Sequence, residues 1–146
     1  MKRKRIENDS LGSKKIDSER FWGAQTQRSL ENFKIGHEKM PKEVIVALGY
    51  QKKAAALANM KLGLLSNKIG NAITKACDQI INLKLIDEFP LKVWQTGSGT
   101  QSNMNANEVI SNYAIKLLLI RFLFALIPFK HFLLKLSIES DNKLID

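Results

Sequence analysis

Cysteine and histidine are scarce in this chain of 146 residues, which contains one cysteine and two histidines. The single cysteine, Cys77, excludes an internal disulfide bond. Its place in an apolar helical pattern indicates a small buried side chain in a reducing compartment. His37 follows Gly36 in a loop-like stretch and is expected to be exposed. The spacing of zinc ligands is absent, and we expect no metal site.

We also expect no secretory leader. Glu7 and Asp9 come before any apolar run, whereas a signal peptide requires an early apolar segment. The same acidic residues argue against an organellar transit peptide, which is poor in acidic side chains. Together with the lone cysteine, these observations lead us to expect a cytoplasmic protein.

Positive charge is in excess, but the sequence signatures of nucleic-acid binding are absent. The formal net charge is +9, which invites a nucleic-acid or membrane-surface interpretation. Four of the basic residues stand together at positions 2–5, and the other lysines are scattered over segments with a helical pattern. An RNP-like aromatic pattern, a recognition-helix signature and zinc-ligand spacing are all missing. We therefore do not expect a nucleic-acid partner.

The apolar pattern predicts a mainly α-helical domain with short extended segments near the amino end. Residues 1–20 show no helical period, and Ser10 and Gly12 suggest a turn between extended pieces. A short helix is expected over residues 21–35, followed by helices over 41–63 and 66–84, with Ser66 as a helix cap. The packing residues expected in the second of these helices are Val44, Ala47, Leu48, Ala54, Ala55, Ala58 and Leu62. Those expected in the third are Ile69, Ile73, Ala76, Cys77, Ile80 and Leu83.

The most informative segment is residues 96–105, which read TGSGTQSNMN and precede a further apolar helical pattern. Glycine lets the backbone approach a ligand closely, and a helix start offers unpaired N–H groups at the positive end of the dipole. The side chains of Ser98 and Thr100 add neutral donors at the same end. The segment is therefore a candidate site for a carboxylate or a phosphate. The alternative is a polar helix cap with a glycine turn and no ligand.

Two familiar phosphate motifs are excluded at this turn. A Walker motif needs a lysine after its last glycine, but Gly99 is followed by Thr100. A dinucleotide fingerprint needs a third glycine where Ser102 stands. The segment contains no acid, base or strong nucleophile, so in an enzyme it would bind and orient a substrate while other residues transfer protons.

Three separate motifs resemble those of class II fumarate hydratases, in the same order along the chain. Residues 21–29 read FWGAQTQRS, residues 87–91 read DEFPL, and residues 95–109 read QTGSGTQSNMNANEV. The resemblance covers about residues 5–116. It implies the amino-terminal domain of the fumarase/aspartase fold, without the central helix bundle that builds the family's homotetramer.

The same resemblance implies a function. Class II fumarate hydratases reversibly hydrate fumarate to L-malate in the citric acid cycle without a cofactor, in active sites shared among subunits. By resemblance, Ser98, Gly99 and Thr100 would bind a substrate carboxylate, and Asn103 would support the turn. The family's later segments, which carry the HPND, SSND, Thr-His and GSSxMPxKxN patterns, have no match in this sequence. No catalytic residue can therefore be assigned, and we expect the chain to be inactive alone.

After Leu118 the sequence departs from the family and becomes apolar and basic. We divide it into a fumarase-like domain at residues 1–116 and an unrelated tail at 117–146. Three interpretations of the tail remain open: a transmembrane helix interrupted by Pro128 and charged residues, a basic interfacial helix, and a frame-shifted or eroded sequence on a truncated gene. The last is favoured by the abrupt change within a helical pattern.

Three hypotheses on function follow from these features. In the first hypothesis, the chain is an amino-terminal fragment of a fumarate hydratase that retains one carboxylate-binding segment. Alternatively, it is a non-enzymatic remnant that binds a partner or a membrane surface through the tail. In a third hypothesis it is active when a second polypeptide supplies the remainder of the fold.

Overall fold

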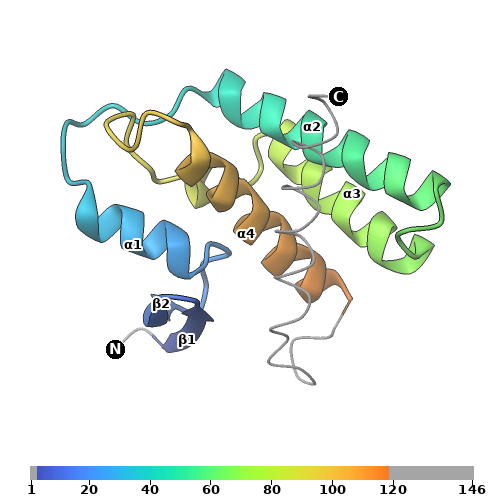
Figure 1. The fold of residues 1–146 in the computed structure, drawn as a ribbon, viewed down its shortest axis with the longest axis horizontal. Coiled ribbons are helices and arrows are strands. Elements are labelled where there is room, and N and C mark those ends of the chain that lie inside the picture. Colours follow the sequence, from blue (N-terminus) through green and yellow to red (C-terminus); the bar gives the residue numbers. More distant parts are fainter. Residues whose placement is uncertain (1–2, 119–146) are drawn as a thin grey trace.

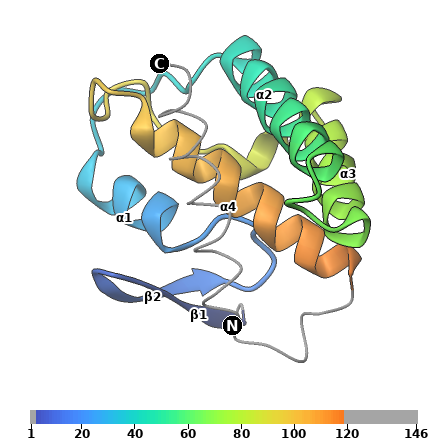
Figure 2. The same ribbon diagram turned by 45° about the vertical axis from the view of Figure 1, so that its right-hand side comes forward.

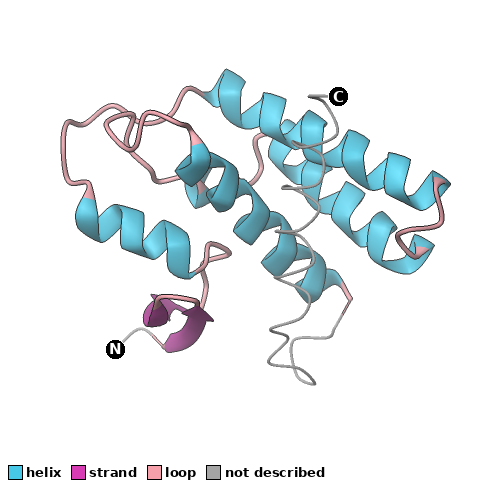
Figure 3. Cartoon of the chain, viewed as in Figure 1, coloured by secondary structure: helices cyan, strands magenta, loops and turns pink. Residues whose placement is uncertain are grey.

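The computed structural model describes residues 3–118, and these form a small, mainly helical fold. A two-stranded hairpin is followed by a short helix, a pair of long helices, a short 3-10 helix and a final long helix. Figure 1 shows the order of these elements, and Figure 3 shows helices and loops from the end of the hairpin to residue 118. The mainly α prediction with extended segments near the amino end is therefore confirmed.

The extended segments form an antiparallel hairpin. Strand β1 (Lys4–Asp9) pairs with strand β2 (Gly12–Asp17), and Asp9 lies opposite Gly12 at the closed end. Gly12 has a φ of 104°, a conformation that side-chain-bearing residues rarely adopt. The predicted turn thus lies where the glycine permits it.

Helix α1 (Ala24–Asn32) is shorter than the helix predicted over residues 21–35. Gly23 precedes it in an extended conformation, and Phe33 ends it. Phe21, only 9% exposed, lies before the helix and packs in the core from an extended segment. Tertiary packing of this side chain, rather than helical period, therefore determines where α1 begins.

Helices α2 (Lys42–Lys61) and α3 (Asn67–Ile81) lie side by side, as Figures 1 and 2 show. Gly63 has a φ of 72° in the turn between them, consistent with its predicted role as a helix stop. The Ser66 side chain accepts a hydrogen bond from the amide of Ile69 at 3.4 Å, which confirms the predicted cap. Helix α3 ends three residues earlier than predicted, because Leu83 adopts a φ of 58° in the turn that follows.

The buried face of α2 differs from the prediction. The fully buried residues are Ile45, Gly49 and Ala56, whereas the expected packing residues Val44 and Leu62 are 42% and 71% exposed. Ala47, Ala54 and Ala58 are exposed as well, whereas Leu48 packs against the core as predicted and Ala55 is half-buried. Apolar or small residues surround most of this helix, so the sequence period does not distinguish the face that packs on α3. Gly49 helps to determine that face, because a Cβ there would lie 3.0 Å from Ile81 Cγ1.

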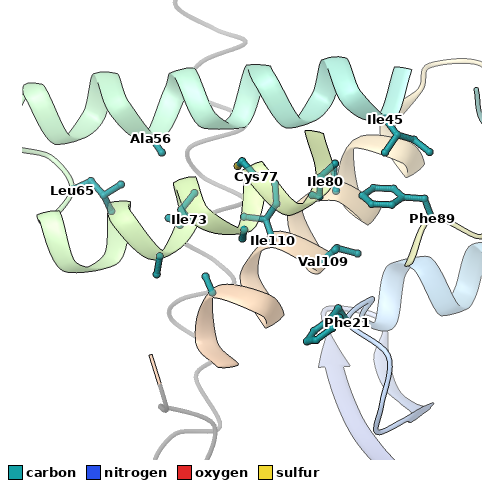
Figure 4. Close-up of a cluster of buried hydrophobic side chains, with 14 residues drawn as sticks. Phe21, Ile45, Ala56, Leu65, Ile73, Cys77, Ile80, Phe89, Val109 and Ile110 are labelled. Carbon is teal, nitrogen blue, oxygen red and sulfur yellow. The ribbon is translucent and has the colours of Figure 1, made fainter. Parts of the chain in front are cut away.

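Helix α4 (Thr100–Leu117) crosses the fold and contacts α1, α2 and α3. The 3-10 helix η1 (Ile86–Glu88) and the following loop deliver the chain to its start. Figure 4 shows side chains from α2, α3, α4 and the segments around Phe21 and Phe89 meeting in one core. Because the core surrounds α4, the position of its first turn is set by the packing of the whole fold.

The predicted tail at 117–146 lies almost wholly outside the described residues, and so do the three interpretations of it. Among the residues that the structure does describe, no helix has the length and apolar character needed to cross a membrane.

Cys77 lies in the core with 0% exposure, as predicted. Burial raises the pKa of its thiol from an ordinary value of 9.0 to about 12, with a smaller contribution from the neighbouring Asp78. The folded chain therefore retains a proton that the unfolded chain loses above pH 9.

This difference predicts a loss of stability at alkaline pH. Between the two pKa values the free energy of unfolding should fall by about 1.4 kcal/mol per pH unit through Cys77. The contribution is present below the unfolded pKa and disappears as pH rises through the folded value. Urea unfolding from pH 8 to 11 should show a shallower pH dependence in Cys77→Ala, which lacks the thiol. If the free energy of unfolding changed with pH in the same way in both proteins, the raised pKa of Cys77 would be contradicted.

Candidate functional site

The glycine turn lies at the start of α4 and is open to solvent. Gly99 immediately precedes the helix with a φ of 72°, in the left-handed region. Residues 96–100 are all exposed, and a Cβ added at Gly97 or Gly99 would meet nothing within 4 Å. Gly99 is therefore required by backbone conformation, while the space beside the turn remains available to a ligand.

Two of the predicted donors lie together at this helix start. The Ser98 and Thr100 hydroxyl oxygens are 3.0 Å apart, and the Thr100 amide lies 3.5 Å from Ser98 Oγ. No side chain caps α4 in the usual way. Gly99 at the N-cap has no side chain, and Ser98 Oγ lies within hydrogen-bonding distance of the first helical amide only. An anion-binding turn and a polar helix start without a ligand therefore both remain predictions.

The turn is braced from behind by an amide side chain. Gln95 Nε2 donates to the Lys92 carbonyl at 2.9 Å and to Ser102 Oγ at 3.0 Å. The backbone N–H of Asn103 donates to the Gly99 carbonyl at 3.2 Å, which is the first intrahelical hydrogen bond of α4. These bonds connect the two ends of the loop and fix the path of residues 96–99.

The arrangement is suited to holding a small anion by neutral donors. Hydroxyl groups, backbone amides and the positive end of the α4 dipole meet at one exposed place. The turn has no acid or base of its own. Among residues 3–118, no group of three or more His, Cys, Asp or Glu side chains could hold a metal ion.

A buried carboxylate joins α4 to the segment before α1. Glu108, 9% exposed, accepts hydrogen bonds from the amides of Gly23, Gln25 and Thr26 and from Thr26 Oγ1, at 2.6–3.1 Å. The amides lie at the start of α1, where a helix has unpaired donors and favours negative charge. Glu108 thus takes the place of a local cap, although it is more than 80 residues away in sequence.

A second buried carboxylate fixes the chain just before this point. Glu88 accepts from the Phe21 amide at 2.7 Å and from Arg20 Nη1 at 3.3 Å. Two asparagines of α4 complete the connection. Asn112 Nδ2 donates to the Phe21 carbonyl at 2.7 Å, and Asn105 Nδ2 donates to the Glu88 carbonyl at 3.0 Å.

Helix α1 is also connected directly to the first turn of α4. Ser29, near the end of α1, donates from its hydroxyl to Gln101 Oε1. Gln101 follows Thr100, so this bond ties α1 to the residue beside the hydroxyl pair. The buried contacts of α4 therefore extend to the edge of the candidate site.

These buried polar residues were not found from the sequence. Glu88 and Glu108 appeared only within motifs carried by the family resemblance. Their partners are distant in sequence, and the amides they bind leave no sequence signal. One signal in the sequence could have indicated them. Glu108 and Asn112 lie inside an apolar helical pattern, and polar side chains buried there need hydrogen-bond partners.

Comparison with known protein families gives a match over most of the chain. A family model described as Lyase matches residues 12–123. The class II fumarate hydratase of Helicobacter pylori strain J99 is 60% identical over 114 residues, which cover 78% of this chain and 25% of that protein. The class II fumarate hydratase of Rhizobium meliloti strain 1021 is 61% identical over 114 residues, again 78% of this chain and 25% of the other protein. The chain thus spans about a quarter of the length of these relatives.

Solved structures give the same result. A class II fumarase from Schistosoma mansoni superposes with a TM-score of 0.77 at 47% identity, covering 79% of this chain and 24% of that one. A fumarate lyase:delta crystallin from Brucella melitensis gives a TM-score of 0.75 at 44% identity, covering 80% and 27%. The fold of residues 3–118 is therefore that of the amino-terminal region of these proteins.

The carboxylate of Glu108 should be a major source of stability. Glu108→Gln keeps the shape of the side chain but replaces one acceptor oxygen by a donor that faces backbone amides. We expect a loss of about 2–4 kcal/mol in the free energy of unfolding, measured by urea denaturation. Glu19→Gln, at an exposed position, is the matched control and should change stability by less than about 0.5 kcal/mol. Equal effects of the two changes would show that the Glu108 bonds contribute little.

Proposed function

This chain belongs to the lyase family, and on that premise we propose that Ser98, Gly99 and Thr100 bind a carboxylate of fumarate or L-malate. The observation that supports the proposal is the exposed, glycine-bearing start of α4. There, two hydroxyl oxygens lie 3.0 Å apart beside a left-handed glycine. The similarity to class II fumarate hydratases supports a dicarboxylate rather than a phosphate as the proposed ligand.

The chemical role of such a site is to hold and polarise the substrate. In hydration of fumarate, the oxygen of water, having lost a proton, adds to one carbon of the double bond. The electron pair moves to the other carbon as a carbanion, whose charge spreads onto the adjacent carboxylate before that carbon takes up a proton. Donors directed at those oxygens stabilise the transition state more than the ground state. The Ser98 and Thr100 hydroxyl groups and the α4 amides would supply that stabilisation, with Asn103 supporting the turn.

Proton transfer requires groups that the turn does not contain. We therefore propose that these 146 residues bind substrate without turning it over, and that the reaction of the citric acid cycle requires the further segments present in the longer relatives. A cytoplasmic location belongs to the same proposal, whereas the homotetramer of the family requires the central helix bundle of the longer relatives. The buried, unpaired thiol of Cys77 supports a reducing compartment.

A binding experiment tests the role of the hydroxyl pair. In an NMR titration with fumarate or L-malate, the amide signals of residues 97–101 should shift and saturate. Thr100→Val removes the hydroxyl at constant shape and should weaken binding about tenfold, because a hydrogen bond to a charged group is lost.

The neighbouring threonine supplies a matched control. Thr96 is exposed in the same loop but lies outside the hydroxyl pair, so Thr96→Val should leave the affinity unchanged. Binding that is insensitive to Thr100→Val, or shifts confined to other parts of the fold, would contradict the proposed site.

A further inference from the structure

Helix α2 has a second, exposed face, and we propose that two copies of this chain associate through it as an antiparallel helix pair. The proposal does not depend on the carboxylate site. It rests on the chemistry of one stripe of residues and on the symmetry of their order along the helix.

The stripe lies on the side of α2 that faces away from the core. It consists of six exposed residues: Glu43, Ala47, Tyr50, Ala54, Leu57 and Lys61. Tyr50 is 59% exposed and Leu57 is 50% exposed, which is high for side chains of this size. Figures 1 and 2 show α2 at the edge of the described fold with α3 along one side. We call these six residues the outer stripe.

The spacing of the outer stripe is that of a helix-pairing seam. Its members alternate four and three residues apart, as the core positions of a coiled coil do. With a rotation of ~100° per residue they fall within a narrow sector of the helix, opposite Ile45, Gly49 and Ala56. The four central residues are apolar or aromatic, so the stripe offers a continuous strip for a second helix.

The order of side-chain sizes along the stripe favours an antiparallel second copy. If a twofold axis passes near Lys52, Ala47 lies opposite Leu57 of the second copy, and Tyr50 lies opposite its Ala54. Each large side chain then faces a small one, which permits close packing. In a parallel pair, Tyr50 would face Tyr50, and the alanines would face each other across a gap.

The charges at the two ends of the stripe select the same orientation. The antiparallel register places Glu43 opposite Lys61 of the second copy, and the twofold axis creates this pair twice. A parallel register would place Glu43 opposite Glu43 and Lys61 opposite Lys61. Neither residue forms an ion pair with another residue in the described part of the chain. Size and charge therefore both identify a second copy of α2, in antiparallel orientation, as the occupant.

Charge reversal tests the proposal in the full chain. Sedimentation equilibrium should show a monomer–dimer equilibrium, and Glu43→Lys or Lys61→Glu should each raise the dissociation constant about tenfold by creating two like-charge contacts. The double variant Glu43→Lys with Lys61→Glu restores both pairs and should return to the original value. Glu19→Lys, which changes the net charge by the same amount as Glu43→Lys at an exposed site elsewhere, should have little effect.

Disulfide trapping tests the orientation independently. A mixture of Ala47→Cys and Leu57→Cys chains should cross-link between the two proteins, since those positions face each other. Ala47→Cys alone should not cross-link, because the two copies of position 47 would lie about 15 Å apart along the helix. The natural thiol does not interfere, because Cys77 is fully buried.

Three results would overturn the proposal. The first is a chain that stays monomeric at every concentration reached. The second is association that charge reversal does not change, which would place the contact elsewhere, including the sequence after residue 118. The third is cross-linking of Ala47→Cys with itself, which would indicate a parallel or unspecific contact.

Discussion

The Glu108 carboxylate accepts four hydrogen bonds from the start of α1, and the arrangement of the amino-terminal third of the fold depends on them. Without this acceptor, the buried amides of Gly23 and Thr26, the Thr26 hydroxyl and the half-buried amide of Gln25 would lose their partner, at a considerable cost in free energy. The fit is close as well. A Cβ on Gly23 would lie 2.6 Å from Glu108 Oε1, so only glycine allows the chain to pass at this distance.

Helix α4 combines this structural role with the candidate site. Its middle carries Glu108, Asn105 and Asn112, which hold the segment around Phe21. Its start carries the hydroxyl pair and the left-handed glycine. Because a single helix bears both, the donors proposed to bind an anion are placed by the same contacts that hold the fold together. The exposed turn therefore needs few contacts of its own to adopt a defined conformation.

The local signals in the sequence were sufficient for some elements and not for others. Helix α3 followed its apolar period and its Ser66 cap, and the glycine turn was recognised from residue types alone. The buried face of α2 could not be predicted, because alanine and other apolar residues surround the helix and only the approach of α3 selects Ile45, Gly49 and Ala56. Glu88 and Glu108 could not be assigned partners, since the amides they bind carry no mark in the sequence. What escaped prediction was the set of contacts between distant segments.

The most direct test is the hydration of fumarate by the purified 146-residue chain, measured by the appearance of L-malate. We propose that this chain holds substrate-binding donors and that the proton-transferring groups belong to other segments of the longer relatives. We therefore predict no turnover by the chain alone, and turnover when a second polypeptide supplies the remaining segments of a class II fumarate hydratase. Turnover by the chain alone, abolished by Thr100→Val, would contradict this proposal.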